Sequence, residues 1–311
     1  MPRGSHIFTR AVALIVLTCA AITNAAASIV TQLPYRVDFD GWYTADISVN
    51  GAPPVPFIID TGATVTSVFQ NLNALHNFET IEGDPVRIIG LFGVHEIPRT
   101  QIGNLGIGDL TVQHHSGALL DDWALPRETP GGVLGLDILS QYIVELDHDE
   151  KVFRLYDNEN REDIDLRGYR ATALSPLGAT GAAGKLYMID ARMNGASLKC
   201  IIDLGASGSV INKPALEKII EHTARRRANV QRIQSALSDV FDNRESAPPV
   251  AIDIIKVAGW RLRQQAVFVH DAQLFAELGV ADEPYCLIGA DLFRGRSMMF
   301  DFDAGMFYLS R

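Results

Sequence analysis

The sequence predicts a mostly β-fold made of two similar lobes that are related by an approximate twofold axis within one chain. Short apolar segments of strand length recur at regular spacing between Gly, Asn and Asp turn signals, which is typical of β-rich proteins. Four blocks of the first half also return, in the same order, in the second half. We therefore expect one lobe per half, with the same patch of each lobe meeting at the axis.

The clearest repeat is a buried strand that ends in an acid. Residues 57–64 read FIIDTGAT, and residues 200–207 read CIIDLGAS, which places Asp203 143 residues after Asp60. The apolar run predicts a buried strand, and a carboxylate at its end is costly to bury unless it is paired or hydrogen-bonded. The following glycine allows a sharp turn. Each copy therefore presents one acid at a tight turn.

Three further blocks support the duplication. Residues 43–51 resemble 187–195, residues 132–139 resemble 286–293, and residues 146–155 resemble 300–309. The last two pairs are 154 residues apart, so the second copy carries 11 extra residues between its acid and its glycine block. An isolated Asp before a Gly is usually a turn former, but that role does not require the same flanking blocks twice. The duplication therefore favours a shared function for the two acids.

These motifs resemble those of the aspartic protease superfamily. The match is apolar-apolar-Asp-Thr-Gly-Ala followed about 70 to 90 residues later by apolar-apolar-Gly, and it extends over nearly all of the chain after about residue 35. The chain is most similar to bacterial retropepsin-like aspartyl proteases, here with two copies fused as in pepsins. The resemblance implies a bilobal aspartic-protease fold with two β-barrel-like lobes and short helices.

The resemblance also implies an aspartic endopeptidase in which Asp60 and Asp203 activate a water molecule. Two adjacent carboxylates share one proton near neutral pH, so one can act as base and the other as acid. No cofactor and no metal is implied. The alternative is a catalytically inactive peptide-binding module of the same fold. This alternative stays open because Leu204 replaces the threonine that Thr61 provides in the first copy, which removes half of a hydroxyl lock across the axis.

The same resemblance assigns supporting roles around the acids. The residues expected to support the active-site loops are Thr61, Gly62, Thr64, Gly205 and Ser207. Ala63 and Ala206 stand where pepsins carry a hydroxyl that bonds the carboxylate. Because that stabilisation of the charged form is missing, we expect higher carboxyl pKa values and a mildly acidic activity optimum.

One hairpin matches the flap of this family. Residues 85–89 and 94–97 read as two strands, and the tip residues expected to contact substrate are Gly90, Leu91, Phe92 and Gly93. The corresponding segment of the second copy, residues 234–239, has no glycine, so only the first copy has an obvious mobile flap. A helix is expected instead after Asn212, which can cap it, with Pro214 in its first turn.

The chain divides into four parts by composition. Residues 1–27 read as a signal peptide, with basic residues at Arg3 and Arg10, an apolar stretch over 11–22, and small residues before Ser28. An uncleaved membrane anchor is the alternative. Residues 28–157 form the N-terminal lobe, 158–184 the connector and 185–311 the C-terminal lobe. Both interpretations export the protein, and we expect the bacterial periplasm.

Charge limits the partners. The net charge is −10, and removal of residues 1–27 takes away two arginines and no acid, giving −12. This argues against a nucleic-acid partner and favours a peptide or flexible protein segment as the substrate. A monomer is expected because one chain holds both lobes. His114–His115 and His148–Glu150 are candidate metal ligands by residue type, but the second group fits a predicted hairpin turn better, and Arg225–Arg227 fits a solvated helix face.

Two cysteines remain after residue 27. Cys200 and Cys286 each lie three residues before a landmark, Asp203 and Gly289, respectively. If the landmark strands are neighbours, as the family fold implies, export permits a disulfide. Two buried, reduced side chains are the interpretation that we favour over the disulfide.

Overall fold

The structure is a computed structural model, and it describes residues 29–38, 40–123, 128–178, 184–223, 236–238 and 244–311. The predicted signal peptide, the Arg225–Arg227 run and part of the second copy's flap segment lie outside these residues. Within the described part of the chain, no helix is both long enough and apolar enough to cross a membrane.

The first copy folds into a closed barrel of six strands. The strands, in spatial order, are β2 (Tyr43–Val49), β3 (Val55–Ile59), β10 (Gly132–Leu134), β4 (Ser67–Phe69), β9 (Leu110–Leu120) and β8 (Arg99–Ile107). Pairing of β2 with β8 closes the barrel. Inward side chains of β2 and all three apolar residues at the end of β3 are buried, as their sequence pattern predicts.

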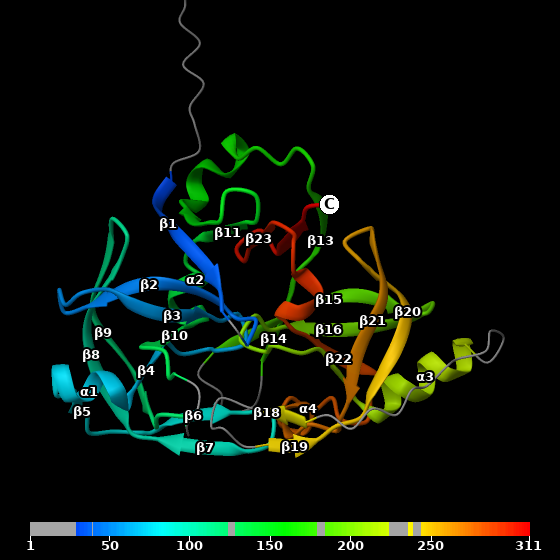
Figure 1. The fold of residues 1–311 in the computed structure, drawn as a ribbon, viewed down its shortest axis with the longest axis horizontal. Coiled ribbons are helices and arrows are strands. Elements are labelled where there is room, and N and C mark those ends of the chain that lie inside the picture. The colour runs from blue at the N-terminus through cyan, green and yellow to red at the C-terminus, as the bar shows by residue number, and fades with distance from the viewer. Residues whose placement is uncertain (1–28, 39, 124–127, 179–183, 224–235, 239–243) are drawn as a thin grey trace, which may run out of the picture.

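The second copy repeats this barrel strand for strand. Its strands, in the same spatial order, are β15 (Lys185–Met193), β16 (Ala196–Ile202), β22 (Tyr285–Ile288), β17 (Val210–Ile211), β21 (Trp260–Val269) and β20 (Pro249–Val257). Pairing of β15 with β20 closes it. The predicted bilobal, mostly β-fold is therefore confirmed, with matching topology in the two lobes (Figure 1).

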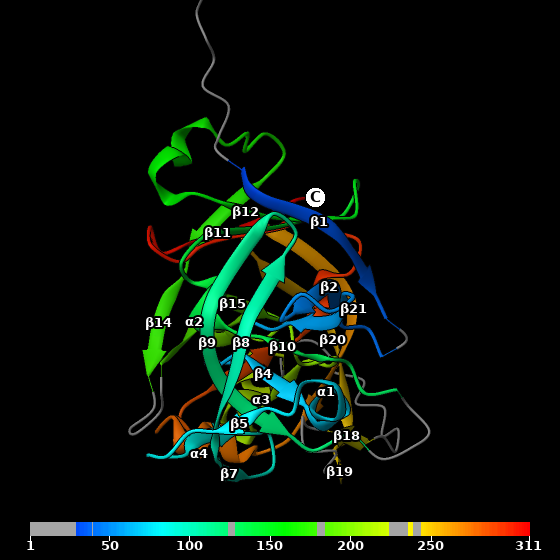
Figure 2. The same cartoon turned by 90° about the vertical axis from the view of Figure 1, so that its left-hand side faces the viewer.

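A third sheet joins the lobes. Its strands, in order, are β13 (Arg170–Ala173), β24 (Met306–Leu309), β23 (Met298–Asp301), β11 (Ile143–Asp147), β12 (Val152–Tyr156) and β1 (Ile29–Val37). The hairpin β11–β12 comes from the first copy and β23–β24 from the second, and they pair edge to edge through β11 and β23. This base sheet lies at one end of the molecule, opposite the hairpin β6 (Val86–Ile89)–β7 (Val94–Ile97), as Figures 1 and 2 both show.

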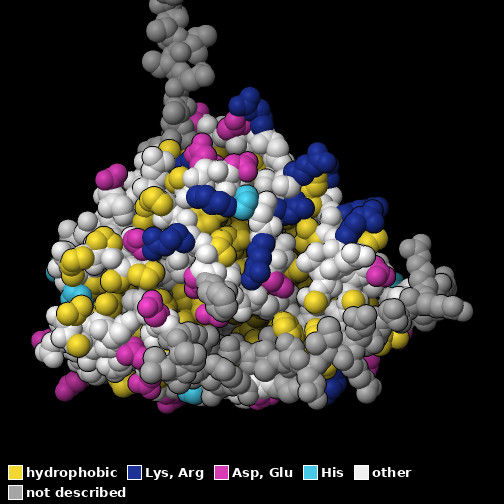
Figure 3. Space-filling view, in the orientation of Figure 1, with side chains coloured by type: hydrophobic (Ala, Val, Ile, Leu, Met, Phe, Trp, Pro, Cys, Tyr) yellow, Lys and Arg dark blue, Asp and Glu magenta, His cyan; other side chains and the backbone are white. Residues whose placement is uncertain are grey.

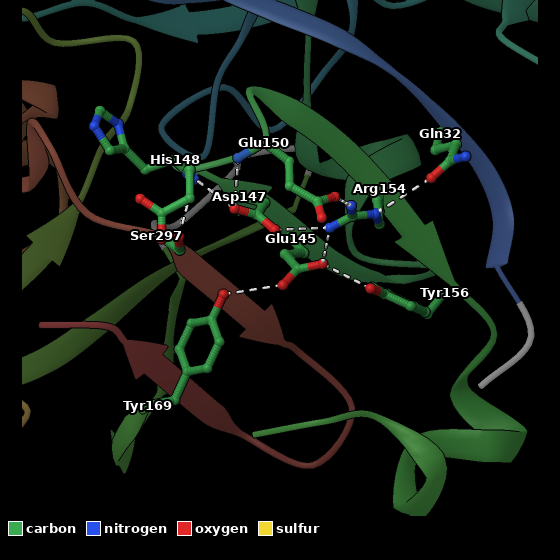
Figure 4. A network of polar contacts seen from close by, with 10 residues as sticks. Gln32, Glu145, Asp147, His148, Glu150, Arg154, Tyr156, Tyr169 and Ser297 are labelled. Atoms are coloured by element: carbon green, nitrogen blue, oxygen red, sulfur yellow. Dashed lines mark hydrogen bonds and ion pairs between the residues drawn. The ribbon is translucent and has the colours of Figure 1, made fainter. Parts of the chain in front are cut away.

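The predicted connector contributes structure to both lobes. Its 3-10 helix η1 (Asn158–Asp163) precedes β13, which pairs with β24, and β14 (Ser175–Gly178) pairs with β15. A buried carboxylate fixes its path, because Glu145 of β11 accepts hydrogen bonds from Tyr169 of the connector (2.9 Å), Tyr156 (2.6 Å) and Arg154 (3.0 Å) (Figure 4). Every charge in this network is paired, as burial requires.

The remaining elements are short. They are α1 (Gln70–His76), β5 (Glu79–Thr80), α2 (Leu136–Leu139), α3 (Lys213–Thr223), β18 (Ala236–Ser238), β19 (Arg244–Ser246), α4 (Gln273–Glu277) and η2 (Ala290–Phe293). The predicted cap of α3 is present, since the Asn212 side chain accepts a hydrogen bond from the Ala215 N–H at 3.0 Å. The turn at Asp149–Glu150 is also present, with both N–H groups donating to Asp147.

Candidate active site

The two acids emerge from equivalent strands. Asp60 follows β3, which runs parallel to β10, and Asp203 follows β16, which runs parallel to β22. The Asp60 N–H donates to Leu134 O and the Asp203 N–H donates to Ile288 O, each at 3.0 Å. The glycine block of each copy therefore holds the backbone of its own acid.

The two carboxyl groups meet across the axis and hydrogen-bond to each other. Gly62 faces the Asp203 carboxyl and Gly205 faces the Asp60 carboxyl, so closely that a Cβ atom at either glycine would collide with the opposite acid. Only glycine fits at these two positions, because any side chain would force the carboxyl groups apart. The structure thus brings together the four residues that the duplication predicts at the centre.

The surroundings of the two acids differ. One oxygen of Asp60 accepts hydrogen bonds from three backbone N–H groups, those of Gly62 (2.6 Å), Ala63 (3.1 Å) and Gly205 (3.2 Å). Asp203 accepts from Ala206 N–H at 3.0 Å. These donors favour the charged form of the carboxyl group that receives them, and Asp60 receives more of them.

The electrostatics follow this difference. Burial raises the pKa of Asp60, and the backbone N–H groups limit the rise. Burial, the adjacent Asp60 carboxylate and the hydrogen bond to it raise the pKa of Asp203 well above its usual range. Two neighbouring carboxylates cannot both ionise readily in such a site. The arrangement therefore favours one negative charge and one shared proton on the pair, with more backbone N–H groups directed at Asp60 than at Asp203.

Thr61 forms the expected half of the hydroxyl lock. Its Oγ1 donates to Ile202 O at 3.0 Å and accepts from the Leu204 N–H at 3.1 Å, both in the opposite lobe. Leu204 is fully buried and has no hydroxyl to return these bonds. The single threonine nevertheless satisfies two backbone groups of the second copy, which ties the two acid loops together.

A second pair of hydroxyls braces the loops from behind. In the first copy, Thr66 Oγ1 donates to Asp137 at 2.6 Å and accepts from the Gly135 N–H at 3.0 Å. In the second copy, Ser209 repeats this geometry, donating to Asp291 at 2.7 Å and accepting from Gly289 at 3.0 Å. Each brace connects the acid loop to the glycine block of its own lobe.

The expected supporting hydroxyls Thr64 and Ser207 lie elsewhere. Thr64 lines the cleft, and Ser207 is exposed at the surface of its loop. The braces lie two residues further on, at Thr66 and Ser209. A signal for them was present in the sequence, because Asp137 and Asp291 occupy the same place in the repeated glycine blocks.

A cleft opens above the acid pair and is lined mostly by apolar side chains. Both acids reach it, and so do Gly90 and Leu91 from the tip between β6 and β7. The apolar lining includes Trp42, Ile58, Val86, Ile88, Leu120, Trp123 and Leu186. An extended, uncharged segment would find apolar contacts along this cleft, with the two acids at its floor.

The hairpin predicted as the flap is present as β6–β7, and its tip is docked on the second lobe. Leu91 O accepts from the Gln273 N–H at 3.0 Å, and Arg87 pairs with Glu277 at 2.6 Å, both on α4. Phe92 turns toward His270 and meets its ring edge-on at 5.2 Å, while Gly93 closes the turn by accepting from the Gly90 N–H. The docking surface on α4 was not foreseen from the sequence.

The two cysteines form a disulfide. Cys200 and Cys286 are directly paired residues of the parallel strands β16 and β22, with a Cα–Cα distance of 4.4 Å. The equivalent pair in the first copy is Phe57 and Gly132, where the phenylalanine ring occupies the space beside the glycine. The same position beneath each acid is thus filled in two different ways.

No metal-binding cluster of three or more His, Cys, Asp or Glu residues occurs in the described part of the chain. His115 lies beside Asp137, with Nε2 and Oδ2 3.2 Å apart. His148 lies in the turn between β11 and β12, next to Lys151. These histidines therefore belong to local polar contacts on the first lobe.

Comparison with known proteins gives a consistent picture. The aspartyl protease family matches two regions, residues 45–138 and 189–292. Among solved structures, the aspartic proteinase from Irpex lacteus is similar, with a TM-score of 0.52 and 12% sequence identity, over 90% of this chain and 96% of that one. At this identity the likeness concerns the fold. A search of curated protein sequences returned no match to this chain.

Proposed function

Because the chain belongs to the aspartyl protease family, we propose that it is an endopeptidase whose acid pair, Asp60 and Asp203, hydrolyses peptide bonds. The observation that supports this most directly is the contact between two carboxyl groups from different halves of the chain at the floor of an apolar cleft. A structural role for either acid would not require the other to face it.

The unequal surroundings of the pair support one assignment of the two roles in this proposal. Asp60, stabilised as a carboxylate, accepts a proton from a water molecule held between the acids. The water oxygen bonds to the peptide carbonyl carbon while Asp203 donates its proton to the carbonyl oxygen. The tetrahedral intermediate collapses as the C–N bond breaks: Asp60 passes its proton to the leaving nitrogen, and one hydroxyl of the intermediate returns a proton to Asp203, which leaves a carboxylic acid and an amine. Both acids end in the state in which they began, with one proton between them.

The cleft indicates the class of substrate. It is lined mostly by apolar side chains and bordered by the flap hairpin, so we expect it to bind an extended peptide or a flexible segment of a protein with large apolar side chains next to the cleaved bond. The apolar contacts would give binding energy without competing with the acids for hydrogen bonds. Folded proteins would be cleaved only where such a segment is exposed.

Several further proposals come from the sequence. We propose that the protein is exported to the bacterial periplasm, acts as a monomer on peptide or protein substrates, and has an optimum at mildly acidic pH. The surface in Figure 3 mixes basic and acidic side chains. A mixed surface of this kind, on a chain with a net charge of −10, supports a protein partner better than nucleic acid.

The decisive experiment is cleavage of an unfolded protein by the wild type and by Asp60→Asn and Asp203→Asn. Each substitution keeps the side-chain size and removes a titrating group, so the rate should fall roughly a thousandfold or more, as expected for members of one catalytic unit. Asp190→Asn is the matched control, because Asp190 is exposed on β15 away from the cleft.

An inhibitor of the statine type, which carries a tetrahedral hydroxyl, should block the wild type. Unchanged hydrolysis in Asp60→Asn would remove the mechanism. Peptide binding without cleavage by the wild type would instead support the inactive binding module.

A further inference from the structure

A second hydrogen bond crosses the axis besides those of Thr61. Trp42 lies in the first lobe, immediately before β2, and its indole Nε1–H donates to Gly205 O at 2.6 Å. Its acceptor belongs to the acid loop of the second lobe, 163 residues away in the chain. The indole therefore holds the loop that carries Asp203 from the opposite lobe.

The acceptor is one end of the peptide group that binds the acid. The Gly205 carbonyl and the Ala206 N–H belong to the same peptide, and that N–H donates to Asp203 Oδ1 at 3.0 Å. A continuous chain thus runs from the indole through one peptide to the carboxyl group. Hydrogen bonds in such chains polarise and strengthen each other. The indole consequently fixes both the position of this peptide and the strength of its hydrogen bond to Asp203.

Trp42 is held in place through hydrogen bonds of its backbone and through packing of its ring. Asp38 Oδ1 accepts from the Gly41 and Trp42 N–H groups at 2.8 and 2.9 Å, and the Asp38 N–H donates to Trp42 O. The ring stacks on Trp123 at 5.1 Å, and Trp123 packs on Phe69. With only 7% of its surface exposed, Trp42 is a preorganised donor that loses little freedom when it binds the loop.

The second copy has no equivalent donor. Tyr43 aligns with Tyr187 in the repeated block, so Leu186 stands where Trp42 stands in the first copy. Leu204 likewise stands where Thr61 stands. Apart from the acids themselves, the side chains among the described residues that hydrogen-bond to the opposite acid loop are Thr61 and Trp42, and both belong to the first lobe.

We propose that Trp42 is a positioning residue for the acid pair, whose indole N–H holds the Gly205–Ala206 peptide in compensation for the hydroxyl that is absent at Leu204. The inference rests on the proposed peptidase function and adds a residue to it. It assigns Trp42 a role beyond lining the cleft, and it explains how a loop with half of its lock missing keeps Asp203 against Asp60.

The first test is Trp42→Phe, which keeps an aromatic ring and removes the donor. Its kcat should fall about tenfold or more, which corresponds to about 1.4 kcal/mol in the barrier. Trp260→Phe is the matched control, since the Trp260 indole also donates to a backbone carbonyl, Leu309 O at 2.8 Å, but lies outside the cleft. The control should keep kcat within about twofold of the wild type.

The second test is rescue by Leu204→Thr. Leu204 is fully buried and does not line the cleft, so a hydroxyl there cannot replace a lost substrate contact of Trp42. If the indole acts by positioning, adding Leu204→Thr to Trp42→Phe should restore most of the kcat that Trp42→Phe loses, whereas it should restore nothing if Trp42→Phe has lost a substrate contact. Should Leu204→Thr fail to fold, Leu204→Ser serves the same purpose.

The third test does not depend on hydrolysis. The chain has three tryptophans, so a ¹⁵N-labelled sample gives three indole signals, and loss of one in Trp42→Phe assigns it. The Trp42 indole proton should exchange slowly with water, also in Asp60→Asn. Exchange at the rate of free indole, equal kcat in Trp42→Phe and Trp260→Phe, or no rescue at position 204 would each overturn the proposal. Hydrolysis unchanged in Asp60→Asn would instead refute the proposed function, and the indole signal would still report whether the tether exists.

Discussion

Replacement of Thr61 by valine removes one hydroxyl and almost no volume, and the structure gives the expected cost. Thr61 is 1% exposed, and Ile202 and Leu204, whose backbone groups it binds, are fully buried. Valine would leave a carbonyl and an N–H without these partners inside the protein. Each of the two unsatisfied buried groups costs about 1–3 kcal/mol, so the free energy of unfolding should fall by about 2–6 kcal/mol.

The assay is equilibrium unfolding in urea, with the slope of the transition compared between variants. An unchanged slope identifies the loss as one of stability. Thr61→Ser is the matched control, because serine keeps the hydroxyl and should retain most of the stability. A loss below about 0.5 kcal/mol in Thr61→Val, or an equal loss in both variants, would refute the view that this hydroxyl ties the lobes together.

Three further predictions concern pH, the flap and the disulfide. Burial and the neighbouring carboxylate raise the pKa of Asp203, so its contribution to stability is present below the unfolded pKa, about 3.9, and is lost as pH rises through the folded value. Asp203→Asn should therefore raise the melting temperature more at pH 8 than at pH 4. An equal rise at both pH values would contradict this. The partly exposed Arg87–Glu277 pair should be worth about 0.5–1 kcal/mol, so Arg87→Gln should speed hydrogen exchange of the flap amides about two- to fivefold, and no change would show that the pair does not hold the flap. Replacing Cys200 and Cys286 by alanine should lower the free energy of unfolding by about 4–5 kcal/mol, because the disulfide joins residues that are 86 positions apart. Thiol titration of the denatured, unreduced chain without residues 1–27 is the direct check, and two reactive thiols would show that no disulfide forms.

The centre of the site could be predicted because it is repeated. A pseudo-twofold axis brings equivalent patches together, so finding Asp60 and Asp203 in matching blocks was enough to expect their contact. Local patterns were equally informative for the flap and for the Asn212 cap, where glycine, proline and capping residues act within a few positions. These features could be predicted because their sequence signal is either repeated in both halves of the chain or confined to a few neighbouring residues.

The contacts that the sequence did not reveal are single and long-range. Arg87 pairs with a residue 190 positions away, and the acceptor of Trp42 lies 163 positions away. No counterpart of either contact occurs among the described residues of the other copy, so a comparison of the halves does not expose these contacts. Such contacts depend on how the lobes sit against each other, which periodicity and turn chemistry do not specify. The Thr66 and Ser209 braces are different, because their partner acids were duplicated and could have been recognised.

The asymmetry of the acid pair follows from the fusion of two copies into one chain. In a dimer of identical halves, each acid loop would receive the same hydrogen-bond donors, and the shared proton would favour neither acid. Here the first lobe supplies the cross-axis hydroxyl of Thr61 and the indole of Trp42, while Asp60 receives three backbone N–H groups. The three backbone N–H groups lower the energy of a negative charge on Asp60, whereas Thr61 and Trp42 hold the backbone of the loop that carries Asp203. Because the two halves can diverge within one chain, a replacement such as leucine at position 204 removes a hydroxyl from one acid loop and leaves Thr61 in the other.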